Sequence, residues 1–265
     1  MPCYFSGNHM KDRHFNIIKT SPDPAENDKL FSAPRNPDDF SFGAETATVF
    51  DDMVNRSVPF YPEIQRMVCE IAKSFAVPGT SIYDIGCATG TTLLLLEETL
   101  QDNVQIVGID NSDEMLAKAA SKLQQHDNSS RVKLINANLN DPPQIENGSV
   151  VILLLTLQFV RPLNRQKLIK SVYDGLLNNG CLILVEKVTG SCTVLNRLFI
   201  EYYYNFKRRE GYSEIEIAQK REALENVLIP YHHEENRKLL LDTGFSHVEE
   251  FFRWYNFSGV VAIKQ

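Results

Sequence analysis

Hydrophobic residues in the middle of the chain form short runs, and these runs alternate with segments in which they recur every three to four residues. The runs have the length of β-strands, and the recurrences have the spacing of amphipathic helices. One run, at 149–155, lacks polar alternation, which is typical of a strand buried on both faces. Strands that alternate with helices predict right-handed βαβ units and a parallel sheet, and therefore an α/β fold. The expected strands are 81–85, 104–109, 132–137, 149–155 and 182–186, and the expected helices are 91–100, 113–125 and 164–177.

Two of these helices carry signals for their ends. Ser112 precedes the helix at 113–125 and is a suitable N-cap, because its hydroxyl can accept a hydrogen bond from the first turn. The sequence Asn178-Asn179-Gly180 is expected to end the helix at 164–177, since both residue types tolerate the left-handed conformation.

The pattern changes toward both ends of the chain. Residues 1–29 are polar and end in two prolines among acidic residues, which predicts a loose N-terminal leader before a single domain at 30–265. After the fifth strand, two long helices at 192–209 and 213–228 interrupt the alternation, and this insert, about 192–228, is expected to be a lid or a dimer element. Further helices are expected at 50–56, 63–75 and 234–242, and closing strands at 247–254 and 257–264.

Composition narrows the class of protein. With 265 residues, 43% of them hydrophobic, the chain can bury a full core. Its 27 Lys and Arg against 34 Asp and Glu give a net charge of −7, which favours a small-molecule partner over direct nucleic-acid binding. No apolar run approaches the ~18 residues of a membrane span, so no membrane partner is expected. Five scattered cysteines without a CxxC motif indicate free thiols, no metal site and a cytoplasmic location.

The residues that follow the first two expected strands carry the candidate chemistry. The first strand ends in YDIGCATG at 83–90, and the second ends in VGIDN at 107–111. Gly86 permits a tight turn close to a ligand, the following helix offers free N–H groups, and Asp110 can bind the hydroxyls of a ribose. A plain turn between strand and helix would need the glycines alone, and the acids Asp84 and Asp110 make that simpler interpretation less favoured.

Ala88 replaces the middle glycine of the dinucleotide fingerprint, which argues against NAD. The arrangement resembles the S-adenosylmethionine (SAM) loop of Rossmann-like methyltransferases. In that family Asn138 and Leu139 would flank the adenine, and Thr156 would face the sulfonium.

Motifs outside this core extend the resemblance to the carboxy-S-adenosyl-L-methionine synthase family, from about residue 29 to residue 264. That family has a SAM-methyltransferase fold, but it moves a carboxylate from prephenate onto the methyl carbon of SAM and releases phenylpyruvate. Its product serves a second enzyme that modifies the wobble uridine of tRNA, and the family is a homodimer whose subunits meet around 202–221. The motifs are KLFSAP (29–34), VFDDM (49–53), RSVPFY (56–61), TLQF (156–159), EK (186–187), NFKR (205–208), GYSE (211–214), QKR (219–221) and LENVL (224–228).

The resemblance implies roles for individual residues. Tyr61 would contact SAM, and Arg221 would bind the new carboxylate. A guanidinium suits that role because it forms two parallel bonds with a carboxylate. The remaining SAM contacts would come from Gly86, Cys87, Ala88, Asp110, Asn111, Asn138 and Leu139.

The chain departs from the family pattern at several of these positions. Ala88 stands where serine is usual, Asn138-Leu139 where an Asp-Ile pair is usual, and Leu154 where an asparagine is usual, so the role of that asparagine is not carried over. Two alternatives therefore stay open: an ordinary SAM-dependent methyltransferase acting on a small molecule or tRNA, and a SAM-binding protein without catalysis.

Two further clusters allow more than one interpretation. The cations at 207–209 could attract a dianionic substrate such as prephenate, contact RNA, or complement the dipole at a helix C-terminus. The tyrosines at 202–204 are interpreted as a packing or subunit face, because no cations interleave with them as in a base-stacking surface.

Overall fold

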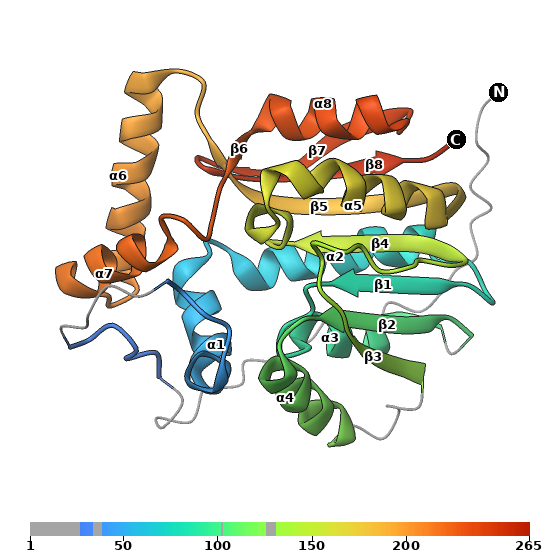
Figure 1. Cartoon of the computed structure of the whole chain (residues 1–265), viewed down its shortest axis with the longest axis horizontal. Helices are drawn as coiled ribbons and strands as arrows, with labels where there is room; N and C mark the ends of the chain where they lie inside the picture. Colours follow the sequence, from blue (N-terminus) through green and yellow to red (C-terminus); the bar gives the residue numbers. More distant parts are fainter. Residues whose placement is uncertain (1–26, 34–38, 102, 126–130) are drawn as a thin grey trace.

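The computed structural model describes residues 27–33, 39–101, 103–125 and 131–265. At its centre is a sheet with the strand order β3-β2-β1-β4-β5-β8-β7 (Figure 1). The first five strands in this order run parallel to one another, and β8 is antiparallel to both β5 and β7. A short β6 pairs with β5. The strands are β1 (Ser81–Ile85), β2 (Gln105–Asp110), β3 (Val132–Asn136), β4 (Gly148–Leu154), β5 (Leu176–Thr189), β6 (Tyr231–His232), β7 (His247–Trp254) and β8 (Phe257–Ile263).

Helices cover both faces of this sheet (Figure 1). On one face α2 (Tyr61–Phe75) and α3 (Thr91–Thr99) bury their apolar sides, and on the other face α5 (Pro162–Gly175) and α8 (His233–Thr243) do so. Alternate residues of β4 belong to the two cores, and all seven are buried. The prediction that this strand is buried on both faces is therefore confirmed.

The remaining helices lie near the ends of the parallel strands. α1 (Ala44–Ser57), α6 (Thr193–Arg209) and α7 (Glu214–Leu224) lie beyond the carboxyl ends of the strands, and α6 stands out from the body of the molecule (Figure 1). α4 (Asp113–Gln124) packs beside β2 and β3. Parallel sheets of this kind bind ligands at the carboxyl ends of their strands, so these helices border the expected site.

Most predicted elements are present, with boundaries that differ by a few residues. The strands predicted at 81–85 and 247–254 agree residue for residue, and Ser112 caps α4 by accepting a hydrogen bond from the N–H of Met115 at 3.1 Å. The first helix begins earlier than predicted, at Ala44, and the helix predicted at 213–228 ends at Leu224.

One prediction about a helix end is wrong. The helix predicted to run to Leu177 and to end at Asn178-Asn179-Gly180 stops at Gly175, and those three residues lie within β5. The reason is tertiary: Gly175 packs directly against Ile145, and Leu176 already pairs with Gly148 of β4. Asn179 does adopt the left-handed conformation, with φ of +65°, but inside an irregular strand.

The leader predicted at 1–29 falls mostly outside the described residues, and the domain boundary stays a prediction. Its last part is described, and there Asp28 is buried, with an exposed fraction of 3%. The Asp28 N–H donates to Asp52 at 2.8 Å, and the hydroxyl of Tyr212 donates to the Asp28 carboxylate at 2.6 Å. Residue 28 is therefore packed against α1 and against the segment that precedes α7.

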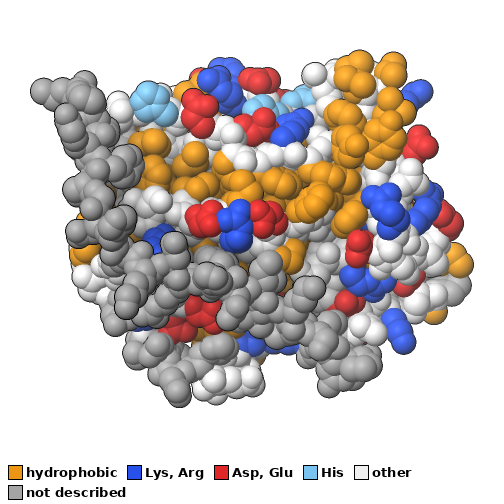
Figure 2. Space-filling view, turned by 180° about the vertical axis from the view of Figure 1, so that it is seen from behind, with side chains coloured by type: hydrophobic (Ala, Val, Ile, Leu, Met, Phe, Trp, Pro, Cys, Tyr) orange, Lys and Arg blue, Asp and Glu red, His pale blue; other side chains and the backbone are white. Residues whose placement is uncertain are grey.

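Hydrophobic side chains form a band across the face shown in Figure 2 and also gather at its upper right, where α6 stands. Val194, Leu195 and Tyr202 are exposed on α6, and Tyr255 from the turn after β7 packs against Tyr202 with tilted rings whose centroids are 5.1 Å apart. We call these four residues the apolar face of α6. No helix in the described part of the chain is both long and apolar enough to cross a bilayer.

Candidate active site

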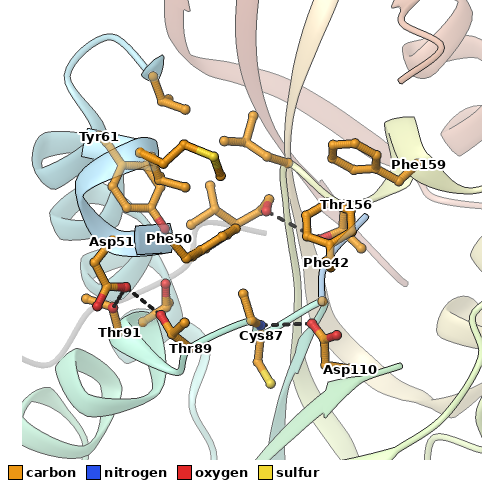
Figure 3. A pocket seen from close by; sticks show the side chains of 18 of the residues that line it. Phe42, Phe50, Asp51, Tyr61, Cys87, Thr89, Thr91, Asp110, Thr156 and Phe159 are labelled. Atoms are coloured by element: carbon orange, nitrogen blue, oxygen red, sulfur yellow. Dashed lines mark hydrogen bonds between the residues drawn. The ribbon is translucent and has the colours of Figure 1, made fainter. Parts of the chain in front are cut away.

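A cavity of about 1080 Å³ opens at the carboxyl ends of the parallel strands. Its walls come from α1, the start of α2, the loops after β1, β2, β3 and β4, the end of β5, and the inner sides of α6 and α7 (Figure 3). A cavity of this size at this position in an open α/β sheet can hold a nucleoside together with a second small molecule.

The loop after β1, residues 86–90, is the glycine loop. Gly86, Ala88 and Gly90 all have positive φ, at +79°, +46° and +78°. The N–H groups of Gly86 and Cys87 donate to the carbonyl of Ile109 at 2.7 and 3.0 Å, which fixes the loop on the neighbouring strand. A side chain at Gly86 would collide with the side chain of Thr156, so the residue must be glycine for Thr156 to pack there.

Asp110, at the end of β2, holds the glycine loop from the other side. Its two carboxylate oxygens accept from the N–H groups of Ala88 at 2.9 Å and of Ser112 at 3.0 Å. Burial raises the pKa of Asp110, and these backbone hydrogen bonds oppose the rise. The carboxylate is thus preorganised at the cavity wall, with lone pairs left for the hydroxyls of a ribose.

Asp84, at the end of β1, is a second buried acid at the same wall. Its exposed fraction is 2%, and burial, with the repulsion of Asp110 added, raises its pKa to about 7. Burial, together with the charge of Asp84, also raises the pKa of Tyr61, so its phenol stays protonated. Asp84 is therefore partly protonated, and the phenol of Tyr61 is neutral. Both can make polar contacts with a cationic ligand, and neither adds a permanent negative charge beside Asp110.

Asp51 joins α1 to the glycine loop (Figure 3). Its carboxylate accepts from the hydroxyls of Thr89 at 2.5 Å and Thr91 at 3.3 Å and from the ammonium of Lys122 at 2.5 Å. Because this carboxylate on α1 binds groups from the glycine loop, α3 and α4, the position of α1 depends on the loop that would contact SAM.

Aromatic side chains cover the cavity on another side. Phe42 makes edge contacts with Phe40 and Phe159, each at 5.1 Å between ring centroids, and lies 6.4 Å from Phe50. These rings line the cavity and exclude water from it. The segment after β4 that carries Phe159 is fixed by buried Glu186, whose carboxylate accepts from the N–H of Leu157 at 2.9 Å.

Three lysines line the cavity from β5, α6 and α7. Lys187, Lys207 and Lys220 form what we call the lysine cluster. Burial lowers the pKa of Lys187 to about 8, of Lys207 to about 6 and of Lys220 to about 8. Mutual repulsion adds to the shift at Lys207. Lysine ammonium groups buried in this way are uncommon in proteins unless an anion lies beside them.

The predicted SAM contacts come together in this cavity. The residues that line it are Tyr61, Gly86, Cys87, Ala88, Asp110, Asn111, Asn138 and Leu139. The Oδ1 of Asn138 accepts from the N–H of Asn140 at 2.9 Å, which leaves the amide nitrogen to donate to an adenine. Leu154 and Thr156 line the cavity as well.

Arg221 does not line the cavity. Lys220 and Leu224 reach it from α7, whereas Arg221 lies on the exposed side of the same helix. The role of Arg221 stays a prediction. No local pattern in the sequence gives an individual role to Lys187 or Lys220 or identifies the aromatic residues around Phe42, because their positions depend on contacts between distant segments.

Two buried thiols, one of them at the cavity wall, have no features of a nucleophile. Burial raises the pKa of the Cys87 thiol well above its ordinary value, and the pKa of the Cys69 thiol rises to about 12 for the same reason. No cluster of three potential ligand side chains for a metal occurs among the residues that the structure describes. The polar groups that the described residues bring to the cavity include acids, lysines and backbone groups.

Comparison with known proteins places the fold in a class. The methyltransferase domain family matches residues 82–180. A SAM-dependent methyltransferase from Methanococcus maripaludis superposes with a TM-score of 0.58 at 16% identity, covering 88% of this chain and 98% of that one. An O-methyltransferase family protein from Burkholderia thailandensis gives 0.63 at 15% identity, covering 87% and 65%. The chain has the fold of a SAM-dependent methyltransferase.

Closer relatives define the family within that class. A carboxy-S-adenosyl-L-methionine synthase from Methylococcus capsulatus is 56% identical over 228 residues, which is 86% of this chain and 94% of the relative. One from Nautilia profundicola is 43% identical over 89% of this chain and 99% of its own length. The chain belongs to the carboxy-S-adenosyl-L-methionine synthase family, a family of enzymes.

Proposed function

We propose that this chain converts SAM and prephenate into carboxy-S-adenosyl-L-methionine and phenylpyruvate. The observation that carries the proposal is the composition of the cavity: groups suited to SAM occupy one side, buried cations suited to an anionic second substrate occupy the other, and aromatic rings exclude water. The names of the relatives support the product. The choice of prephenate rests on the resemblance of the motifs described above.

The proposed chemistry balances without an added oxidant or reductant. Loss of carbon dioxide and hydroxide from prephenate makes its ring aromatic and leaves phenylpyruvate. The hydroxide takes a proton from the sulfonium methyl of SAM to form water and an ylide, and the ylide carbon attacks the carbon dioxide. A cavity closed by apolar rings would retain carbon dioxide and protect the ylide from protonation by water.

We also propose that the chain acts as a homodimer that meets along the apolar face of α6. The exposed hydrophobic side chains there support this surface. In one copy Arg221 is exposed outside the cavity, so its contact with the new carboxylate would require a second copy to bring it there. The product would then serve another enzyme that modifies the wobble uridine of tRNA, and this chain need not bind the tRNA itself.

Product analysis by mass spectrometry tests the reaction. Purified protein incubated with SAM and prephenate should release phenylpyruvate and form a nucleoside heavier than SAM by one carbon dioxide. The control omits prephenate and should leave SAM unchanged. Absence of both products, or transfer of a methyl group to prephenate, would overturn the proposal and favour a non-catalytic SAM-binding protein or an ordinary methyltransferase, respectively.

A further inference from the structure

The lysine cluster is organised around the rings of Tyr203 and Tyr212. The ammonium nitrogen of Lys187 lies 4.7 Å from the centre of the Tyr203 ring, and that of Lys207 lies 5.5 Å from the same ring. Lys207 and Lys220 lie 5.2 and 5.3 Å from the Tyr212 ring. Aromatic faces stabilise cations that have lost part of their hydration, but they do not neutralise them.

Only one of the three lysines has a negatively charged partner in the described part of the chain. The ammonium of Lys220 donates to the hydroxyl of Ser57 at 3.0 Å and lies 3.5 Å from the Asp28 carboxylate. For Lys187 and Lys207 the described residues provide ring contacts and no hydrogen bond or ion pair of the ammonium group. Lys207 is nonetheless only 4% exposed, so its ammonium group is buried without a direct hydrogen-bonded or ion-paired partner among the described residues, although the charges of Asp28 and Glu216 act on it from farther away.

The position of the two unpaired lysines separates them from the nucleoside side of the cavity. Asp110 ends β2, whereas Lys187 lies near the end of β5, and the strand order puts three strand spacings between them. At ~4.8 Å per spacing this is a separation of about 14 Å. A ligand group that reaches these lysines therefore lies on the far side of β4 from the ribose site.

We propose that Lys187 and Lys207 bind the carboxylate that the second substrate keeps through the reaction. This inference rests on the proposed function, in which an acid with two carboxylates loses one of them as carbon dioxide. A cation bound to the departing carboxylate would stabilise the ground state more than the transition state, because the negative charge leaves that group as carbon dioxide forms. The same cation bound to the retained carboxylate orients the substrate without opposing the reaction.

The electrostatics of the cluster agree with this geometry. Burial lowers the pKa of both lysines, and at Lys207 the repulsion of Lys220 and Lys187 adds to the shift while Asp28 and Glu216 oppose it. Burial also lowers the pKa of Lys220, but there the Asp28 carboxylate lies within ion-pair distance. Two of the three ammonium groups at the cavity therefore have no direct ion-pair partner among the described residues, and the third is paired with Asp28.

Substitutions that remove the charge and leave a long apolar side chain test the proposal. Lys187→Met and Lys207→Met replace the ammonium group with most of the side-chain length kept, and Arg209→Met removes an exposed cation from the helix of Lys207 as a matched control. Each protein is measured for SAM affinity by calorimetry, for kcat and KM with prephenate, and for binding of 2-phenylsuccinate, an inert aromatic dicarboxylate. Unchanged SAM affinity also shows that a variant has folded.

The expected result is a rise of at least ~10-fold in KM for prephenate and in Kd for phenylsuccinate in both lysine variants, the loss typical of one charge-assisted hydrogen bond. SAM affinity and the Arg209→Met protein should be unchanged. An equal loss of SAM affinity would overturn the proposal, because the lysines would then bind the carboxylate of SAM. A fall in kcat with constant KM would overturn it as well.

The proposed function and this inference fail in different ways. If the unaltered protein makes the heavier nucleoside but the lysine variants keep normal KM values, the subsite is wrong and the reaction stands. If the unaltered protein does not act on prephenate, yet binds phenylsuccinate through these lysines, the carboxylate site stands and the second substrate is a different acid.

Discussion

Gly86 and Gly79 share the same backbone conformation and differ in their surroundings. Both have φ of +79°, but a side chain at Gly86 would strike Thr156, whereas a side chain at Gly79 would meet nothing within 4 Å. Alanine variants at the two positions therefore share the free-energy cost of backbone strain. Only the variant at Gly86 adds the cost of a clash with Thr156 beside the proposed SAM site.

We expect Gly79→Ala and Gly86→Ala each to lose about 1–2 kcal/mol of stability from strain at positive φ. Gly86→Ala should lose about 1–3 kcal/mol more from overpacking, and its SAM affinity should fall at least ~10-fold. Chemical denaturation and calorimetry with SAM measure the two effects. Equal SAM affinity in the two variants would contradict the role given to the packing of Thr156 on Gly86.

Residues whose role depends on local geometry were predictable from the sequence, and those whose role depends on distant contacts were not. Gly86 and Asp110 follow strands that hydrophobic runs define, so their meeting at one sheet edge could be inferred. Lys207 is in a helix whose polar residues would ordinarily face water. It is buried because Tyr203 packs on Phe257 of β8 and because Asp28 approaches from the N-terminal segment, and no local pattern encodes either contact.

Among the elements, α1 has the most direct connection to the glycine loop. Asp51 joins it to Thr89 and to Lys122, although the helix itself belongs to a part of the chain before the sheet begins. The hydrophobic pattern predicted only half of α1, and its function in holding the loop became visible only in the assembled fold.

Asp51→Asn should weaken this connection, because it removes the charge that pairs with Lys122 and keeps the shape of the side chain. We expect a loss of about 1–3 kcal/mol in stability, and a loss of SAM affinity of roughly threefold to tenfold. Glu63→Gln breaks an exposed pair with Arg66 on α2 and should change stability by less than about 1 kcal/mol. Normal SAM binding by Asp51→Asn would show that α1 does not control the loop.

The limits of prediction at the level of elements are illustrated by β5. Asn178-Asn179-Gly180 is a common helix-ending sequence, and its left-handed residue is indeed present. The contact of Gly175 with Ile145 and the pairing of Leu176 with β4 end the helix earlier, since ladder hydrogen bonds replace the helical ones. The α/β fold itself was predictable, because five strands and their helices follow one repeating pattern.

At the scale of the whole molecule, the apolar face of α6 bears on the state of assembly. Val194 and Leu195 are 67% and 48% exposed on a helix that stands out from the body of the protein (Figure 1). A surface of this kind, rimmed by polar residues, is typical of a protein interface.

Light scattering after size exclusion should therefore give the mass of a dimer for the unaltered chain and of a monomer for the double variant Val194→Glu and Leu195→Glu. Charges buried at an interface without partners would cost more than the contact provides. Leu163→Glu is the matched control, because Leu163 is a 95% exposed leucine on α5 and should leave the dimer intact. A dimer that survives the double variant would place the interface elsewhere.

The buried ammonium of Lys207 also implies that substrate binding takes up a proton. With a pKa of about 6 the group is largely neutral at pH 7.5, while Lys187, Lys220, Asp28 and Glu216 supply the charges that face it. A bound carboxylate raises that pKa, so each binding event draws up to one proton from the buffer, and affinity should decrease as pH rises above 7. The heat of phenylsuccinate binding should accordingly differ between phosphate and Tris, two buffers with very different ionisation enthalpies. This difference should become much smaller in Lys207→Met, where only Lys187, with a pKa of about 8, can still take up a fraction of a proton.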